Sequence, residues 1–147
     1  MQLAKLVQPQ DISVLLIEDS QSDATAITKA MIYGEPLYNF IITYKKSLAE
    51  GLGFLDGSTA DVILLDLNLP DAKELKAIDE VHGLFPDLPI VVVSGYSDMD
   101  IVHQALRKGA QEFLIKGECS GAAIRQSIYQ AIIRKKIEQS YKRGDKL

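Results

Sequence analysis

Short runs of apolar residues alternate along the chain with segments in which apolar residues recur every three to four positions. The runs have the length of strands and lie at Val14–Ile17, Phe40–Ile42, Val62–Leu65, Ile90–Val93 and Phe113–Ile115. The first, third and fourth runs lack polar alternation, which is typical of strands covered by helices on both faces. This order of elements predicts an α/β fold, a doubly wound five-stranded parallel sheet with helices on both faces.

The segments between the runs carry helix signals. Ser20–Asp23, Ser47–Glu50 and Ser97–Asp100 each fit the S/T-x-x-D/E pattern, in which a hydroxyl caps the first turn of a helix. Apolar positions at helical spacing accompany these and two further segments: Ala24, Ile27 and Met31; Leu48, Leu52 and Leu55; Leu75, Ile78 and Val81; Ile101, Ala105 and Leu106; Ile124, Ile128, Ala131 and Ile132. Gly51 and Gly53 each cost about 1 kcal/mol of helix propensity, so we expect the second helix to be short.

Composition limits what this chain can be. Its 147 residues, 47% hydrophobic and 24% charged, suit one globular domain. No apolar run approaches the roughly 18 residues of a membrane span, and the first ten residues lack the apolar core of a signal peptide, so we expect a cytoplasmic protein without a membrane segment. A single cysteine, Cys119, excludes an internal disulfide and a cysteine-based metal cluster.

The charge of the chain argues against a nucleic-acid surface on the domain. The formal net charge is -4, and the clearest cationic run is Arg134–Lys136. Because Ile133 and Ile137 flank this run, its pattern favours a continued helix with a solvated basic face.

Polar side chains follow four of the five predicted strands. Glu18 and Asp19 follow the first strand, Asp66 the third, Ser94 the fourth and Lys116 the fifth. In a parallel α/β sheet these strand ends meet at the edge where ligands bind. Three crowded carboxylates favour a hard cation such as Mg²⁺. With Lys116 and the cation neutralising an incoming phosphoryl group, Asp66 is placed to act as a nucleophile.

Each of these residues also has an ordinary structural interpretation. The acidic pair could be a charged helix entry, Asp66 a loop carboxylate, Lys116 a solvated lysine and Ser94 a turn cap. Their joint occurrence at one sheet edge favours the functional interpretation. Asp71 and Asp98 fit turn and first-turn acids better than ligands.

The segments LLIEDS, VILLDLNLPD, IVVVSGYSD and EFLIKG together resemble the receiver domain of two-component response regulators. The resemblance covers residues 12–134, leaving an N-terminal extension at 1–11 and a basic C-terminal helix extension or tail at 135–147. It implies the flavodoxin-like receiver fold. It also implies roles for seven residues. Asp19 would ligate Mg²⁺ directly and Glu18 largely through water, Asp66 would be phosphorylated and bind the metal, and Asn68 would lend its backbone carbonyl to the metal. Lys116 and Ser94 would contact the phosphoryl group, and Ser94 and Phe113 would form a switch.

Two positions depart from the pattern of that family. Gly117 follows Lys116 where receivers usually carry proline, and Glu74 stands four residues beyond Pro70 where they favour glycine. These differences concern the shape of two loops rather than the reacting groups.

The resemblance implies a phosphoacceptor signalling domain and not an enzyme. Its phosphoryl donor would be a histidine kinase or a histidine phosphotransfer protein, and its output a downstream effector protein or a linked domain outside this chain. An alternative is a Mg²⁺-dependent phosphatase of the haloacid-dehalogenase type with Asp66 as nucleophile. That class needs a second Asp two residues later as general acid, where this chain has Asn68. A flavin or nucleotide carrier would need a Gly-rich phosphate loop in place of EDSQSD, whose carboxylates repel phosphate.

Overall fold

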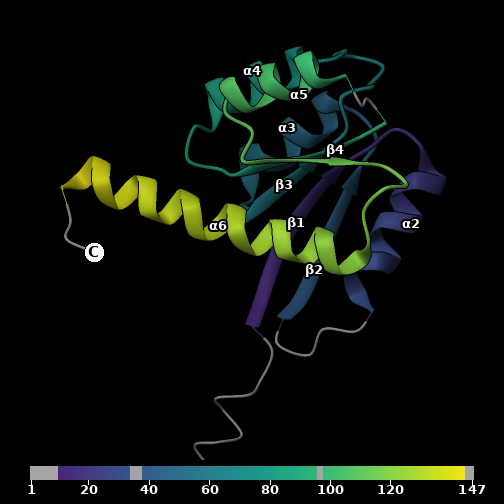
Figure 1. Ribbon diagram of the computed structural model, residues 1–147, viewed down its shortest axis with the longest axis horizontal. Coiled ribbons are helices and arrows are strands. Elements are labelled where there is room, and N and C mark those ends of the chain that lie inside the picture. Colours follow the sequence, from purple (N-terminus) through teal and green to yellow (C-terminus); the bar gives the residue numbers. More distant parts are fainter. Residues whose placement is uncertain (1–9, 34–37, 96–97, 145–147) are drawn as a thin grey trace, which may run out of the picture.

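Five parallel strands form one sheet in the computed structural model, which describes residues 10–33, 38–95 and 98–144. The strands are β1 (Gln10–Ile17), β2 (Tyr38–Lys45), β3 (Val62–Leu65), β4 (Ile90–Ser94) and β5 (Glu112–Ile115), and the helices are α2 (Gln21–Ile32), α3 (Leu48–Gly57), α4 (Lys76–Leu84), α5 (Met99–Arg107) and α6 (Gly121–Arg143). The strands lie in the order β2-β1-β3-β4-β5, and Figure 1 shows the sheet with the helices around it. The predicted doubly wound parallel sheet is confirmed.

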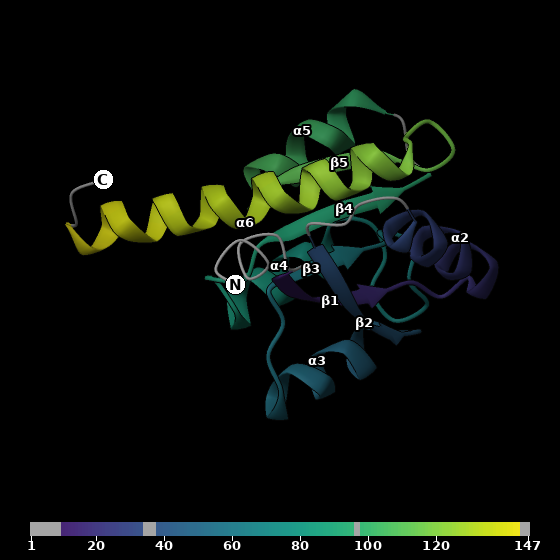
Figure 2. The same cartoon turned by 90° about the horizontal axis from the view of Figure 1, so that it is seen from below.

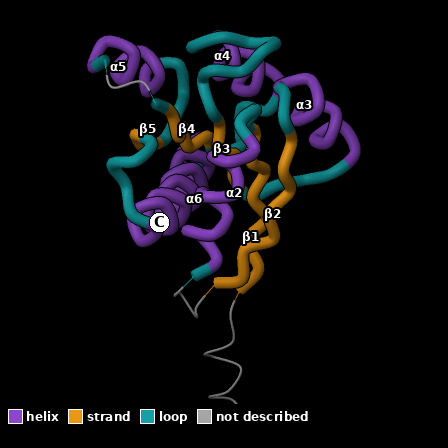
Figure 3. Tube along the Cα trace, turned by 90° about the vertical axis from the view of Figure 1, so that its right-hand side faces the viewer, coloured by secondary structure: helices purple, strands orange, loops and turns teal. Residues whose placement is uncertain are grey.

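The helices cover the two faces of the sheet unequally. Helices α3, α4 and α5 lie on one face and α2 and α6 on the other, as Figure 3 shows from the side. Successive residues of β1 serve opposite faces: Leu15 and Ile17 pack under α3 and α4, whereas Val14 and Leu16 pack under α2 and α6. All four residues of β3 are buried, in agreement with its unbroken apolar run.

Two strands are longer than their apolar runs. β1 begins at Gln10 rather than Val14, and β2 spans Tyr38–Lys45 rather than Phe40–Ile42. The two strands pair in parallel over their whole length, from Gln10 with Tyr38 to Ile17 with Lys45. Backbone pairing at the sheet edge therefore recruits polar residues that hydrophobic pattern alone omits.

Serine and aspartate caps start several helices. Ser20 and Ser47 cap α2 and α3 as predicted, each accepting from the backbone N–H three residues on. The prediction for Ser97 was wrong: α5 begins at Met99, and its cap is Asp98, whose carboxylate accepts from the backbone N–H of Asp100. Ser97 itself lies outside the described residues. Ser120 caps α6 in the same way.

The two glycines of the ten-residue helix α3 have different surroundings. A Cβ on Gly51 would come within 2.9 Å of Ile17 Cγ1 and nearer still to its Cδ1, whereas a Cβ on Gly53 would meet nothing within 4 Å. Gly51 is therefore needed for the close approach of α3 to β1, and Gly53 is not.

Helix α6 continues unbroken from Gly121 to Arg143, across position 134 where the predicted domain ends. Its C-terminal part runs past the strands, as Figures 1 and 2 show. The predicted solvated basic face is wrong for Lys135, which is buried with its ammonium 3.6 Å from Glu138 Oε2, while Arg134 and Lys136 are exposed. Lys135 continues the buried stripe of Ile124, Ile128 and Ala131, so its aliphatic stem replaces an apolar side chain there. Within the described residues, no helix combines the length and apolar character needed to cross a bilayer.

Candidate functional site

Backbone hydrogen bonds hold the strand-end residues in place. Each residue that follows a strand donates its N–H to a residue of the neighbouring strand: Glu18 to Lys45 O (3.0 Å), Asp66 to Ile17 O (3.0 Å) and Lys116 to Ser94 O (2.9 Å). Backbone contacts thus fix the ends of β1, β3 and β5 relative to their neighbours, independently of the side chains.

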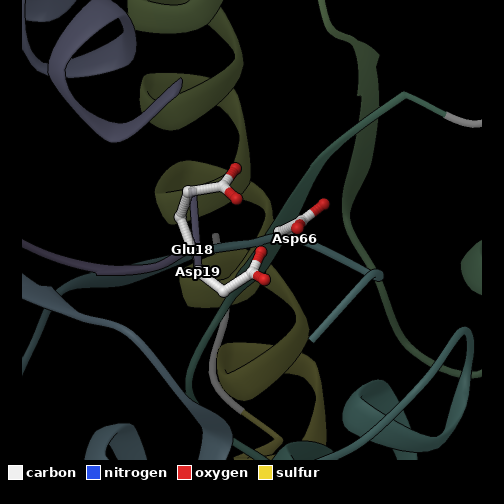
Figure 4. A group of neighbouring side chains, drawn as sticks. All are labelled: Glu18, Asp19 and Asp66. Atoms are coloured by element: carbon white, nitrogen blue, oxygen red, sulfur yellow. The ribbon is translucent and has the colours of Figure 1, made fainter. Parts of the chain in front are cut away.

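Three carboxylates gather at this edge. One oxygen from each of Glu18, Asp19 and Asp66 lies within 4.8 Å of the others, and Figure 4 shows the three side chains together. Glu18 and Asp66 are 1% and 3% exposed, and Asp19 is exposed. Hard oxygen donors with one open side are the ligand set that Mg²⁺ takes from proteins, so these residues fit such a cation.

Lys116 is the cation of the cluster. Its Nζ lies 2.5 Å from Glu18 Oε1, 2.9 Å from Asp23 Oδ2 and 3.4 Å from Asp66 Oδ1. Burial alone would lower the pKa of Lys116, but hydrogen bonds to Glu18 and Asp23 and the charge of Asp66 raise that pKa overall. The lysine therefore stays charged within the cluster.

The carboxyl group of Glu18 has a raised pKa. Burial raises the pKa of this carboxyl group to about 7, the charge of Asp66 adds to the rise, and the contact with Lys116 opposes it. Its Oε2 accepts a hydrogen bond from the backbone N–H of Ser20 at 3.1 Å. One lysine does not offset the buried acidic pair of Glu18 and Asp66, and a further cation would.

The side chains surround an open cleft of about 510 Å³. Its lining consists of Glu18, Asp19, Ser20, Asp23, Asp66, Asn68, Ser94, Gly95 and Lys116. Six of the seven residues singled out from the sequence thus line one cleft.

Phe113 is the exception: it is not among the described residues that line the cleft. It is half-buried on β5, beside Val92 of β4, and packs against the core under α3, α4 and α5. Its predicted switch role remains a prediction.

The two departures from the family pattern have defined geometries. Glu74 adopts a left-handed φ of 55°, and its N–H donates to Leu67 O at 2.6 Å, closing the loop after β3 without the usual glycine. Gly117 has a φ of 80°, and no cis peptide bond occurs among the described residues, so the Lys116–Gly117 bond is trans.

Asp23 belongs to the cleft and was missed from the sequence. Its position three residues after Ser20 suggested only a capping box, and the Ser20 hydroxyl does accept from the Asp23 N–H at 3.3 Å. The carboxylate instead binds Lys116 from the first turn of α2. Its place in the sequence could have indicated this role, because the first turn of α2 begins directly after the acidic pair at the edge of the sheet.

Comparison with known proteins points to one family. The response regulator receiver domain family matches residues 14–129. The chain is 31% identical over 104 residues to the C4-dicarboxylate transport transcriptional regulatory protein DctD of Rhizobium meliloti, covering 71% of this chain and 22% of DctD. It is 34% identical over 105 residues to the transcriptional regulatory protein CitT of Halalkalibacterium halodurans, covering 70% of this chain and 45% of CitT. This chain therefore spans less than half the length of these two relatives.

Solved structures agree. The signal receiver domain of a LuxO repressor protein from Vibrio parahaemolyticus superposes with a TM-score of 0.74 at 26% identity, over 88% of this chain and 95% of that one. A response regulator receiver domain from Clostridium thermocellum gives a TM-score of 0.73 at 25% identity, over 86% and 98%. The phosphatase alternative finds no support among these relatives. Motif, fold and family match coincide over the same residues, and the chain belongs to the response regulator receiver domain family of two-component signalling systems.

Proposed function

We propose that Asp66 is the phosphoacceptor of this receiver domain and that the reaction depends on Mg²⁺. The observation that carries the proposal is the position of the Asp66 carboxylate, which is buried at the end of β3 beside the acidic pair and the Lys116 ammonium. Glu18, Asp19, Asp66 and the backbone carbonyl of Asn68 would hold the cation, which when bound would neutralise charge on the phosphoryl oxygens.

The chain's own residues would do the rest. An Asp66 carboxylate oxygen forms the new bond to phosphorus as the donor's leaving group departs with its bonding electrons. Lys116 donates a hydrogen bond to a phosphoryl oxygen. The buried Ser94 hydroxyl, one strand away, donates another. Movement of Ser94 toward the phosphoryl group would open space for Phe113 and so change the surface formed by α5, β5 and α6.

The donor and the recipient of the signal lie outside this chain. We propose a histidine kinase or histidine phosphotransfer protein as donor and a cytoplasmic setting for the exchange. The relatives named as transcriptional regulatory proteins extend well beyond the matched region. They support a linked output domain or a separate effector protein as the recipient.

Mass spectrometry tests the assignment. Wild-type protein incubated with Mg²⁺ and acetyl phosphate should gain the mass of one phosphoryl group, and chelation of Mg²⁺ should prevent the gain. Asp66→Asn should abolish it, while Asp56→Asn, which changes an exposed carboxylate on α3, should leave it intact. Labelling of Asp66→Asn at wild-type yield would refute the assignment.

A further inference from the structure

Asp71 joins the loop that follows Asp66 to a distant helix. Its carboxylate accepts hydrogen bonds from the backbone N–H groups of Leu48 (3.0 Å) and Ala49 (2.9 Å). These are the first two amides of α3, which have no acceptor within their own helix. Burial raises the pKa of Asp71, but the two hydrogen bonds outweigh it and lower the pKa overall, so the carboxylate is held ionised. A residue expected to serve a local turn therefore caps a helix more than 20 positions away.

The loop between Asp66 and Asp71 is a packed unit. Asn68 forms a bridge with Lys73, and the Glu74 N–H donates to Leu67 O. Leu67 and Leu69 are 0% and 1% exposed. A loop closed and buried in this way moves as a whole, so the anchor at Asp71 also determines where Asn68 lies in the cleft.

Helix α3 is in turn fixed to the acidic pair. Gly51 packs against Ile17, the residue directly before Glu18. Lys45, at the end of the strand that leads into α3, accepts the Glu18 N–H. The contact of Asp71 with α3 thus connects the loop after β3 to the same helix that packs against the end of β1.

We propose that Asp71 is a positioning residue, which sets the distance between the loop carrying Asn68 and the acidic pair by anchoring that loop to the N-terminus of α3. This inference rests on the proposed function, since it concerns the same metal and phosphoryl site. Asp71 does not line the cleft and acts only through the loop.

Ser47 provides a matched control. Its hydroxyl caps the same helix by accepting the Glu50 N–H at 3.2 Å, and its hydrogen bonds to described residues stay within the first turn of α3. Ser47→Ala and Asp71→Ala each remove a cap from the N-terminus of α3, and only the second releases the loop. Asp71→Asn retains one amide oxygen as acceptor and should behave between wild type and Asp71→Ala.

The experiment titrates Mg²⁺ alone into each variant of the 147-residue chain and follows binding by NMR, with urea unfolding measured in parallel. We expect Asp71→Ala to weaken Mg²⁺ binding by up to about tenfold, the lower end of the loss for a direct outer-shell partner, because Asp71 acts through the loop; Asp71→Asn should recover part of the affinity. Ser47→Ala should lose similar stability and keep wild-type affinity. Faster amide hydrogen exchange at Leu48 and Ala49 in Asp71→Ala would report the broken bonds directly.

Two results would overturn the inference, and they differ. Equal Mg²⁺ affinity in Asp71→Ala and Ser47→Ala, with wild-type binding intact, would make Asp71 a helix cap alone. Absence of Mg²⁺ binding in wild type, with no change in Asp19→Asn, would remove the metal site itself and with it the proposed function. If Asp71→Ala fails to fold, the Mg²⁺ affinities of Asp71→Asn and Ser47→Ala are compared instead. Weaker binding in Asp71→Asn supports the inference, and equal binding overturns it.

Discussion

Substitution of Gly51 by alanine should have the opposite sign to that expected from helix propensity. Gly51 and Gly53 lie two positions apart in α3, and alanine at either should gain about 1 kcal/mol from propensity alone. Gly53 is exposed with open space around it, so Gly53→Ala should raise the free energy of unfolding by roughly that amount. Gly51 is buried against Ile17, which changes the balance.

The magnitude for Gly51 follows from the contact. The new Cβ would stand 2.9 Å from Ile17 Cγ1, and Ile17 is 0% exposed and branched at Cβ, so it has little freedom to turn aside. Overpacking of this kind costs roughly 1 to 3 kcal/mol. The gain from propensity is common to both variants, so Gly53→Ala should exceed Gly51→Ala in unfolding free energy by roughly 1 to 3 kcal/mol.

Urea unfolding followed by circular dichroism measures the difference. Because Ile17 immediately precedes Glu18, Gly51→Ala should also weaken Mg²⁺ binding, whereas Gly53→Ala should not. Equal stabilisation of the protein by both substitutions would show that α3 can move away from β1 without cost, and the close approach would lose its structural importance.

Two further predictions concern the cleft and its loop. Glu74→Gly should raise the free energy of unfolding by about 1 kcal/mol in urea titrations, since a left-handed φ is costly for residues with a Cβ; a lower value would reveal a stabilising contact of the Glu74 side chain. Asp23→Asn should tighten binding of beryllofluoride, a phosphoryl mimic, about two- to fivefold in NMR titrations. The reason is that Lys116 would lose its ion pair with this half-exposed carboxylate and could interact more strongly with the mimic. Weaker binding would mean that Asp23 orients the lysine.

Hydrophobic pattern predicted the sheet because buried parallel strands need continuous apolar runs. The runs at β3 and β4 agree with the observed strands to within one residue. The start of β1 at Gln10 was not predictable in this way, since Gln10 and Asp11 are exposed and enter the strand only through pairing with Tyr38 and Asn39. Such pairing depends on a segment 28 positions away rather than on local sequence.

The site was predictable to the extent that it follows from topology. Parallel strands bring their carboxyl ends to one edge, so residues that end strands, such as Glu18, Asp66 and Lys116, had to meet. Asp23 and Asp71 escaped because their local patterns already had an explanation, as a capping-box acid and a turn acid. The Asp23 carboxylate binds Lys116, 93 positions away, and the Asp71 carboxylate binds the amides of Leu48 and Ala49, 23 and 22 positions away. Only the folded chain brings these groups together.

In the proposed function, the charge balance of the cleft would connect the metal to the switch. With its carboxylates ionised, the cleft sets Glu18, Asp19, Asp23 and Asp66 against Lys116, an excess of about three negative charges, which a divalent cation would reduce to about one. A phosphoryl group on Asp66 would carry a charge of about -1.5 to -2 at neutral pH in place of the carboxylate's single charge, so phosphorylation would make the cleft more anionic. The added oxygens need new donors, and Ser94 at the end of β4 is buried beside them. Since an unpaired buried charge is costly, the free energy for the proposed movement of Ser94 would come from the same electrostatic imbalance that favours a bound metal.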